Sequence, residues 1–271
     1  MQNLQNINFK MYAPKAPLDK YVQAIWLAKK IDNIEVQPFK ILSDCAASVV
    51  FNFAGSLELN RGSECTRVDN QGVIIGPGKD LLTKTFNGPI NAIGIHFLAS
   101  GGHVFFSQTM DTLANQFVGN AANSFLGGLA LSKQLTHLSE NTHPKILIDI
   151  VESHLVSELS QYEGQAQQRL SHLLHLVENG ADFSLQDLAN SLDVSIREVQ
   201  RIFKQFVGVA PNVFLRVNKI NQIKGKVANN DFTTLTELAI ESGYFDQAHF
   251  TREFKLFMQA TPKQYQKIKM M

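Results

Sequence analysis

The chain has 271 residues, enough for one large domain or two smaller ones, and 44% of them are hydrophobic, as in globular proteins. No run reaches the roughly 20 apolar residues of a membrane span, and the polar start MQNLQNINFK lacks the apolar core of a signal peptide. Cys45 and Cys65 are the two cysteines, too few for a four-thiolate zinc site. We therefore expect a cytoplasmic protein with reduced thiols, no membrane partner, no metal and no cofactor.

The net charge of +1 divides unevenly along the chain. Residues 1–164 carry 12 Lys and Arg against 14 Asp and Glu, whereas residues 165–271 carry 13 against 10. The basic excess is therefore C-terminal. It permits a nucleic-acid partner for that part of the chain without requiring one.

The first hundred residues contain short runs of β-branched, aromatic and leucine residues, each closed by Gly, Asn or Pro. These runs are AASVVFNFAG, SLELNRG, QGVIIGPG, LLTKTFNGPI and NAIGIHFLASGG. Short strands with frequent turns predict a barrel or a sandwich.

Helical spacing replaces this pattern between Met110 and Gln161, where Leu147, Val151 and Leu155 fall on one face. We expect a helical hairpin that closes the first domain and, through its apolar stripes, mediates homodimerisation. The polar segment around Gly164 predicts the boundary between a domain over residues 1–164 and a second over residues 165–271.

The second domain begins with two capped helices. Ser184 and Asp187 have the spacing of a capping box, as do Ser195 and Glu198. The second helix carries apolar residues at intervals of 0, 3, 4 and 7, namely Val199, Ile202, Phe203 and Phe206. Two helices joined by a short turn have the form of a helix-turn-helix unit.

The same design occurs twice. A shift of 51 residues superimposes Arg201 on Arg252, Phe203 on Phe254 and Pro211 on Pro262. Upstream, DLA of residues 187–189 matches ELA of residues 237–239 at an offset of 50, so the second copy has one extra residue in its turn. The sequence thus predicts two helix-turn-helix units.

Each unit offers side chains suited to double-stranded DNA. Arginine can bind guanine through two hydrogen bonds, glutamine can pair with adenine, and lysine can neutralise phosphate. The candidate contacts are Ser195, Arg197, Gln200, Arg201 and Lys204 in the first copy, and Gln247, His249, Arg252 and Lys255 in the second. Asp246 is expected to cap the second helix, and capping also accounts for Glu198 without any base contact.

The segment PNVFLRVNKINQIKGKVANN predicts one helix linking the two units, because Pro211 suits a first helical turn and an apolar stripe follows. About 17 residues would span roughly 25 Å, enough to hold two recognition helices near the roughly 34 Å between successive major-groove faces. Gly225 within it weakens the helix.

These paired motifs, over about residues 170–268, resemble the AraC/XylS family of bacterial transcription regulators. The resemblance implies two helix-turn-helix units that bind near a promoter and usually activate RNA polymerase. Gln259 stands where the family favours glycine, and Ala248 where it favours serine. The N-terminal half is similar to the β-barrel sensor half of some members, which binds a small effector, dimerises, or both.

We therefore expect an α+β protein of two domains: a β-barrel-like (cupin-like) domain with closing helices, and an all-α double helix-turn-helix domain. A small apolar effector would contact barrel residues, for which the candidates are Trp26, Phe51, Phe53, His96 and Phe97. Aromatic residues on strands also serve simply as core packing, so the candidates carry both interpretations.

Two alternatives remain at this stage. The protein could be an effector-independent regulator, controlled by its abundance or by a protein partner. It could also be a metal-dependent β-barrel enzyme fused to a DNA-binding module, but His96 and His103 lack the third ligand that a convincing metal site needs.

Overall fold

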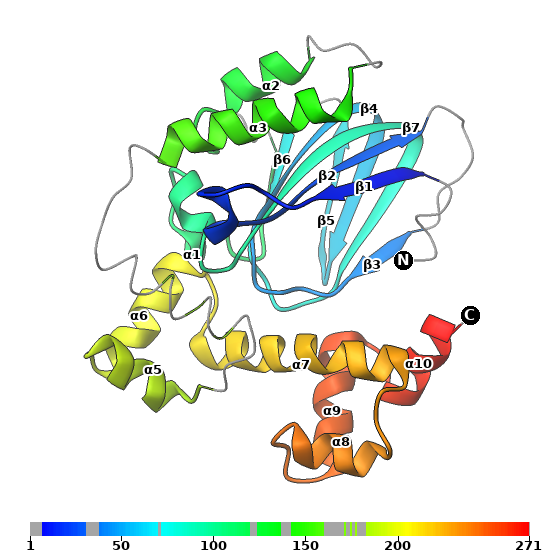
Figure 1. Ribbon diagram of the computed structural model, residues 1–271, viewed down its shortest axis with the longest axis vertical. Coiled ribbons are helices and arrows are strands. Elements are labelled where there is room, and N and C mark those ends of the chain that lie inside the picture. The colour runs from blue at the N-terminus through cyan, green and yellow to red at the C-terminus, as the bar shows by residue number, and fades with distance from the viewer. Residues whose placement is uncertain are drawn as a thin grey trace.

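The computed structural model describes residues 7–30, 38–69, 72–119, 124–136, 142–159 and 183–270, with 171, 174 and 177 as single residues. The strands are β1 (Asn8–Tyr12), β2 (Val22–Lys30), β3 (Phe39–Ile41), β4 (Ser48–Arg61), β5 (Glu64–Asp69), β6 (Gly72–Ile75), β7 (Leu82–Phe97) and β8 (Phe117–Gly119). The α-helices are α1 (Met110–Leu113), α2 (Gly128–Thr136), α3 (Pro144–Leu159), α5 (Leu185–Leu192), α6 (Ile196–Phe206), α7 (Pro211–Asn229), α8 (Leu235–Glu241), α9 (Gln247–Met258) and α10 (Pro262–Met270). A β-rich N-terminal part is thus followed by a helical C-terminal part (Figure 1). The expected domain boundary at residue 164 lies outside the described residues.

The strands form one antiparallel sheet in the order β1-β2-β7-β4-β6-β8, with β3 added to β7 and β5 added to β4. The expectation of a β-rich domain next to a helix-turn-helix domain is confirmed. The barrel is only approximate, because β1 and β8 end the described sheet and do not pair with each other.

Glycines bend the two longest strands instead of ending them. The runs AASVVFNFAG and SLELNRG, which meet at Gly55, form the single strand β4. The runs LLTKTFNGPI and NAIGIHFLASGG, which meet two residues after Gly88, both contribute to β7, so the turns expected between these runs are wrong. Both glycines have positive φ, and a Cβ on Gly55 would lie 2.4 Å from the carbonyl oxygens of Asn87 and Pro89. The irregularities therefore face each other across the β4–β7 pair and let the sheet fold over.

The sheet has two buried faces because side chains alternate along each strand. On β2, Ile25 and Leu27 belong to the face covered by α2 and α3. Trp26 and Ala28 belong to the opposite face, which is buried where the sheet folds over on itself. The helical cover expected between residues 110 and 161 is present as α2 and α3, with Val151 and Leu155 buried. The short strand β8 in the same region was not expected.

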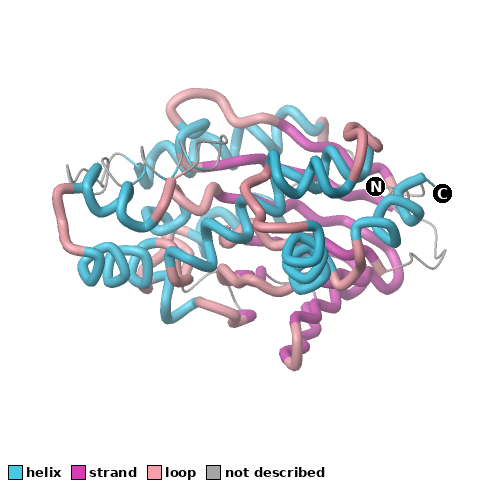
Figure 2. The backbone as a smooth tube through the Cα atoms, turned by 90° about the horizontal axis from the view of Figure 1, so that it is seen from below, coloured by secondary structure: helices cyan, strands magenta, loops and turns pink. Residues whose placement is uncertain are grey.

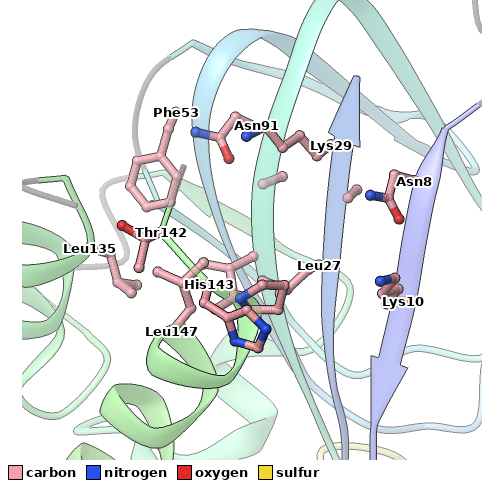
Figure 3. Close-up of a pocket in the computed structure, with 14 residues that line it drawn as sticks. Asn8, Lys10, Leu27, Lys29, Phe53, Asn91, Leu135, Thr142, His143 and Leu147 are labelled. Carbon is pink, nitrogen blue, oxygen red and sulfur yellow. The ribbon is translucent and has the colours of Figure 1, made fainter. Parts of the chain in front are cut away.

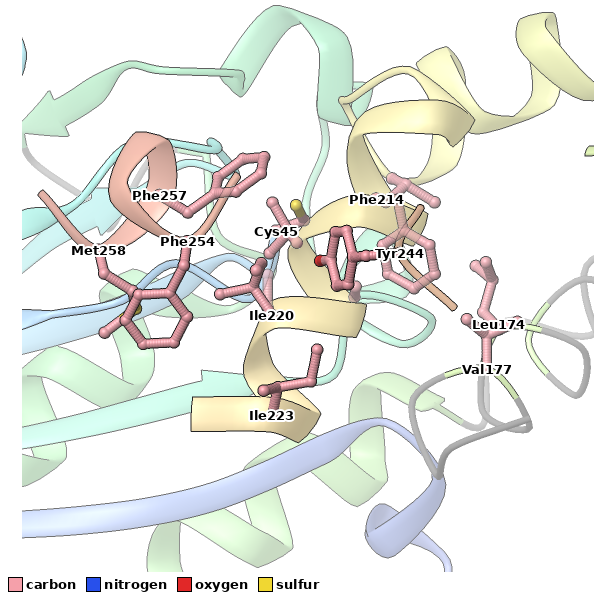
Figure 4. Packing of buried hydrophobic residues seen from close by; sticks show 14 of the residues in the cluster. Cys45, Leu174, Val177, Phe214, Ile220, Ile223, Tyr244, Phe254, Phe257 and Met258 are labelled. Carbon is pink, nitrogen blue, oxygen red and sulfur yellow. The ribbon is translucent and has the colours of Figure 1, made fainter. Parts of the chain in front are cut away.

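The C-terminal helices pack around α7. Its stripe of Phe214, Val217, Ile220, Ile223 and Val227 is buried in a cluster that both helix-turn-helix units share (Figure 4). The linking helix is therefore confirmed, and its 19 residues span about 28 Å at the usual rise. No helix among the described residues is long and apolar enough to cross a membrane.

The two parts of the chain are docked together, with α7 running along the sheet domain (Figures 1 and 2). Cys45 is fully buried in the C-terminal cluster, and Asn221 of α7 donates a 3.0 Å hydrogen bond to the Ser43 carbonyl. The ring of His103 packs edge-on against Phe206 at the end of α6, 5.1 Å between centroids. The first helix-turn-helix unit is therefore anchored to the N-terminal part.

Candidate functional site

The first candidate DNA-reading helix, α6, is capped by Ser195, whose hydroxyl accepts a 3.2 Å hydrogen bond from the backbone of Glu198. Its apolar face buries Val199 and Phe203 in the helical core. The polar residues expected to contact DNA are exposed on the remaining surface: Arg197, Gln200, Arg201 and Lys204. The structure thus presents the first candidate set together on one solvent-facing surface.

Glu198 binds a side chain that was expected to read DNA. The Arg201 guanidinium donates to both carboxylate oxygens of Glu198, from Nε at 2.9 Å and from Nη2 at 2.6 Å. Hydrogen bonding to Arg201 lowers the pKa of Glu198, which stays ionised. Only half of the expected capping box forms, because this carboxylate binds Arg201 instead. The Arg201 guanidinium, which could form two hydrogen bonds with a guanine, is therefore already bound to Glu198 in the free protein.

The second candidate DNA-reading helix, α9, is capped by Asp246, whose carboxylate accepts a 2.6 Å hydrogen bond from the His249 backbone, as expected. Gln247, His249, Arg252 and Lys255 are all exposed. The helix ends at Gln259 with φ of 53°, the left-handed geometry that favours glycine.

Neighbouring side chains orient two of these candidates. Thr236 of α8 donates a 2.8 Å hydrogen bond to the Gln247 side-chain oxygen. The Tyr244 ring meets His249 edge-on, with 5.3 Å between centroids. The N-terminal end of α9 is therefore ordered before any DNA is bound.

The helix α7 holds the second unit through side chains that no sequence pattern indicated. Arg216 donates to both oxygens of Glu253 on α9, at 2.8 and 2.6 Å, and lies 5.3 Å over the Phe257 ring. Lys219 lies 4.8 Å over the Tyr244 ring. The charge of Glu253 is thus balanced by Arg216. These partners lie 37 residues apart, so no local pattern indicates the pairing.

A pocket of about 310 Å³ lies between the sheet and the closing helices (Figure 3). Its apolar lining comes from Leu27, Phe53, Ile93, Leu135 and Leu147. Lys10, Lys29 and His143 also line it, the last directly before α3. The pocket therefore combines apolar side chains with two lysines, a histidine and the polar residues Asn8, Asn91 and Thr142.

Of the five effector candidates, Phe53 lines this pocket and the other four lie elsewhere. Phe51 and Phe97 are fully buried against α2, α3 and the turn at Gly102–Phe105. Trp26 lies in the fold of the sheet, 5.2 Å beneath the Lys84 ammonium, whose pKa burial lowers to about 8. The structure does not bring the five together.

His96 lies near the junction with α7. One ring nitrogen is 2.6 Å from the Ser48 hydroxyl and the other 2.6 Å from an Asp44 carboxylate oxygen. Burial raises the pKa of Asp44, but the His96 charge and hydrogen bond outweigh this and lower it. Within the described ranges, no three His, Cys, Asp or Glu side chains are grouped to hold a metal ion.

Comparisons with known proteins match both parts of the chain. Residues 188–268 match a family described as a helix-turn-helix domain, and residues 10–119 match a domain of unknown function (DUF6597). An uncharacterised helix-turn-helix transcriptional regulator of Staphylococcus aureus is 33% identical over 84 residues, 31% of this chain and 11% of that protein. One from Haemophilus influenzae is 31% identical over 86 residues, 32% of this chain and 28% of that protein. The chain thus matches only a small part of each relative's length.

Solved structures with a similar arrangement include ToxT of Vibrio cholerae with bound unsaturated fatty acid, at 12% identity and a TM-score of 0.46, covering 88% of this chain and 91% of that one. An AraC-type regulator of Chromobacterium violaceum is 21% identical, with a TM-score of 0.35, over 38% of this chain and 94% of that one. The repeated capped units around α7 and the matched domain show that residues 188–268 form a helix-turn-helix domain similar to those of transcription regulators, and the paired units resemble the AraC/XylS family.

Proposed function

We propose that this protein binds double-stranded DNA sequence-specifically in the cytoplasm and regulates transcription, with residues 165–271 binding DNA and residues 1–164 sensing and dimerising. The observation that carries the proposal is the pair of capped helices, α6 and α9, joined by α7 and exposing Arg, Lys, Gln and His side chains. Joined by α7, whose 19 residues span about 28 Å, they suit two neighbouring major-groove segments on one face of a duplex.

A salt series with the full chain tests DNA binding. Because cationic side chains release counterions from phosphates, affinity for a duplex should fall steeply between about 50 and 200 mM salt. The steepness should reflect the number of phosphates that the protein neutralises. The matched control is a variant with Arg197, Lys204, Arg252 and Lys255 all changed to Gln, which should bind weakly with a shallow salt slope. An unchanged affinity in this variant would rule out α6 and α9 as the DNA-binding surface.

From the resemblance to the AraC/XylS family we infer activation of transcription through contact with RNA polymerase. Transcription in vitro from a promoter carrying the preferred site is the direct measurement. Addition of the protein should raise transcript yield, whereas a fall in yield would identify a repressor.

The effector is assigned to the pocket between the sheet, α2 and α3. Its apolar residues suit a hydrocarbon body, and Lys10, Lys29 and His143 suit a negatively charged group. We infer a small, largely apolar effector with a carboxylate. This deepens the expectation of an apolar ligand and moves it from the five barrel candidates to the surroundings of Phe53.

Thermal unfolding across a series of aliphatic carboxylates, with the matching alcohols as controls, tests the pocket. Carboxylates should raise the unfolding temperature more than alcohols of equal length, and Leu147→Trp, which fills the space, should abolish the shift. Operator binding is then measured with each stabilising compound, because an effector must favour one arrangement of the two parts. Shifts that persist in Leu147→Trp would place the ligand elsewhere.

Homodimerisation is assigned to the outer faces of α2 and α3. Leu129, Ile146 and Val156 are exposed there, at 53%, 50% and 40%, although the opposite faces of these helices already cover the sheet. Light scattering should give a dimer mass for the wild type and a monomer mass for Ile146→Glu. Met11→Glu, at a more exposed apolar residue on β1, is the control that should stay dimeric.

The effector-independent regulator remains the second candidate, favoured by one observation. The fold of the sheet is filled by its own side chains, including Trp26, Val50, Leu57, Leu59 and Phe86, all buried. If no compound stabilises the protein, control by abundance or by a protein partner takes the place of sensing.

A further inference from the structure

The turn of the second helix-turn-helix unit carries the most exposed large hydrophobic residue of the described chain. The Phe245 side chain is 87% accessible, whereas no other large hydrophobic residue in the described ranges exceeds 61%. Exposing a phenylalanine to water forfeits the free energy that burial would supply. The position therefore calls for a function beyond packing.

Comparison of the two units shows that Phe245 is the extra residue of the second turn. Val194 and Tyr244 occupy the same place, because their backbone amides donate to the equivalent carbonyls of Ala189 and Ala239. In the first unit the helix cap, Ser195, follows Val194 directly. In the second unit Phe245 is inserted between Tyr244 and the cap, Asp246. The insertion has no counterpart in the first unit.

The backbone holds Phe245 from both sides. Tyr244 is buried against Phe250, 5.3 Å between ring centroids, beneath the Lys219 ammonium. Asp246 is fixed by its capping bond to His249. Tyr244 thus provides the apolar packing that the residue before a cap often supplies, and leaves Phe245 projecting from a rigid turn. A side chain held in this way loses little freedom when it makes a contact.

We propose that Phe245 contacts the 5-methyl group of a thymine in the major groove, next to the bases that α9 reads. The N-terminal residues of such helices approach base edges, and Phe245 directly precedes the cap of α9. The thymine methyl is the apolar group of the major groove, and phenylalanine is among the side chains that contact it. Phe245 would thus give the second unit a base preference that the first unit lacks.

The surroundings of Phe245 favour DNA over a protein partner. Its neighbours Asp246, Gln247, Ala248 and His249 are all exposed, and three of them are polar. A single aromatic ring among polar residues at the end of a basic helix differs from the contiguous apolar patch of a protein interface. A contact with RNA polymerase is therefore the alternative that the experiment must separate.

The inference rests on the proposed DNA binding, and the test uses the full chain and the duplex recovered by selection from random sequences. The wild-type site should contain a thymine preference that Phe245→Ala loses and Phe245→Leu partly keeps. Phe245→Ala should weaken binding to that duplex about five- to twenty-fold. Replacing the thymine by deoxyuridine, which removes only the methyl group, should weaken the wild type and leave Phe245→Ala unaffected. Leu256→Ala, an exposed apolar residue further along α9, is the control for affinity.

The outcomes separate this inference from the proposed function. If the wild type selects no sequence, DNA recognition itself fails. If it selects a site but Phe245→Ala keeps the same affinity and preference, the thymine contact is wrong. Unchanged DNA binding with lost transcription activation would instead identify Phe245 as a polymerase contact and overturn the inference. Equal weakening of both proteins by deoxyuridine would also overturn it.

Discussion

At the scale of single residues, two of the side chains proposed to contact DNA are hydrogen-bonded to other side chains of the protein. Arg201 is held by Glu198, and Gln247 is held by Thr236. The Arg201–Glu198 pair is exposed, so it adds little stability and is easily exchanged for a base or a phosphate. In the proposed function, Glu198 would therefore compete with DNA for Arg201.

Glu198→Gln should bind DNA more tightly than the wild type, because it removes the competitor and a negative charge from the surface that faces phosphate. We expect an increase of about two- to tenfold at low salt that shrinks as salt rises. Glu241→Gln, an exposed position at the end of α8, makes the same charge change outside α6 and α9. Fluorescence anisotropy with one duplex measures both. Equal gains in the two variants would show that net charge, rather than release of Arg201, is responsible.

His103 should make the folded protein sensitive to acid. Burial lowers its pKa to about 4 in the folded protein, against about 6.5 in the unfolded chain. The unfolded chain therefore binds a proton that the folded protein does not between these values, so stability is highest above pH 6.5 and falls toward pH 4. The full loss is about 3 kcal/mol. Denaturant unfolding at pH 7.5 and 4.5 should show a smaller difference in His103→Phe than in the wild type. An identical difference would show that His103 takes up its proton when folded.

At the scale of elements, local patterns predicted the C-terminal part better than the N-terminal part. Caps, apolar stripes and the 51-residue repeat lie within single helices, which is why α5 to α9 could be placed from the sequence. Gly55 and Gly88 look like turn signals, but they face each other across two strands that are paired only in the fold. The pocket and the Arg216–Glu253 clamp join distant segments, so no local pattern could predict them.

Gly225→Ala should stabilise the protein by about 0.5–1 kcal/mol, because glycine weakens a helix interior and a Cβ at this exposed position of α7 meets no atom within 4 Å. Gly208→Ala is the contrasting variant. Gly208 has φ of +82°, and its added Cβ would lie 2.6 Å from the Met110 carbonyl oxygen, so it should destabilise the protein. Urea midpoints compare the two. A destabilised Gly225→Ala would mean that α7 needs the glycine for bending.

At the scale of the whole molecule, the two helix-turn-helix units are held differently. The first contacts the N-terminal part through Phe206 and Gly208, whereas the Arg216 and Lys219 side chains of α7 hold the second. A change in the N-terminal part can therefore act on α6 first. If the N-terminal part senses an effector as proposed, the docked junction of Cys45, Asn221 and His103 would give that signal a physical route to the DNA-binding helices.

Selection of duplexes from random sequences by the full chain tests the central claim most directly, with Arg197→Ala, Arg252→Ala and Lys204→Ala measured beside the wild type. The wild type should select a site with two base-specific segments about one helical turn apart. Arg197→Ala and Arg252→Ala should each relax one segment and lose about 1–3 kcal/mol on the preferred site, whereas Lys204→Ala should weaken all sequences alike. A wild-type protein that enriches no sequence, or variants that all lose affinity equally on preferred and random duplexes, would contradict sequence reading by α6 and α9.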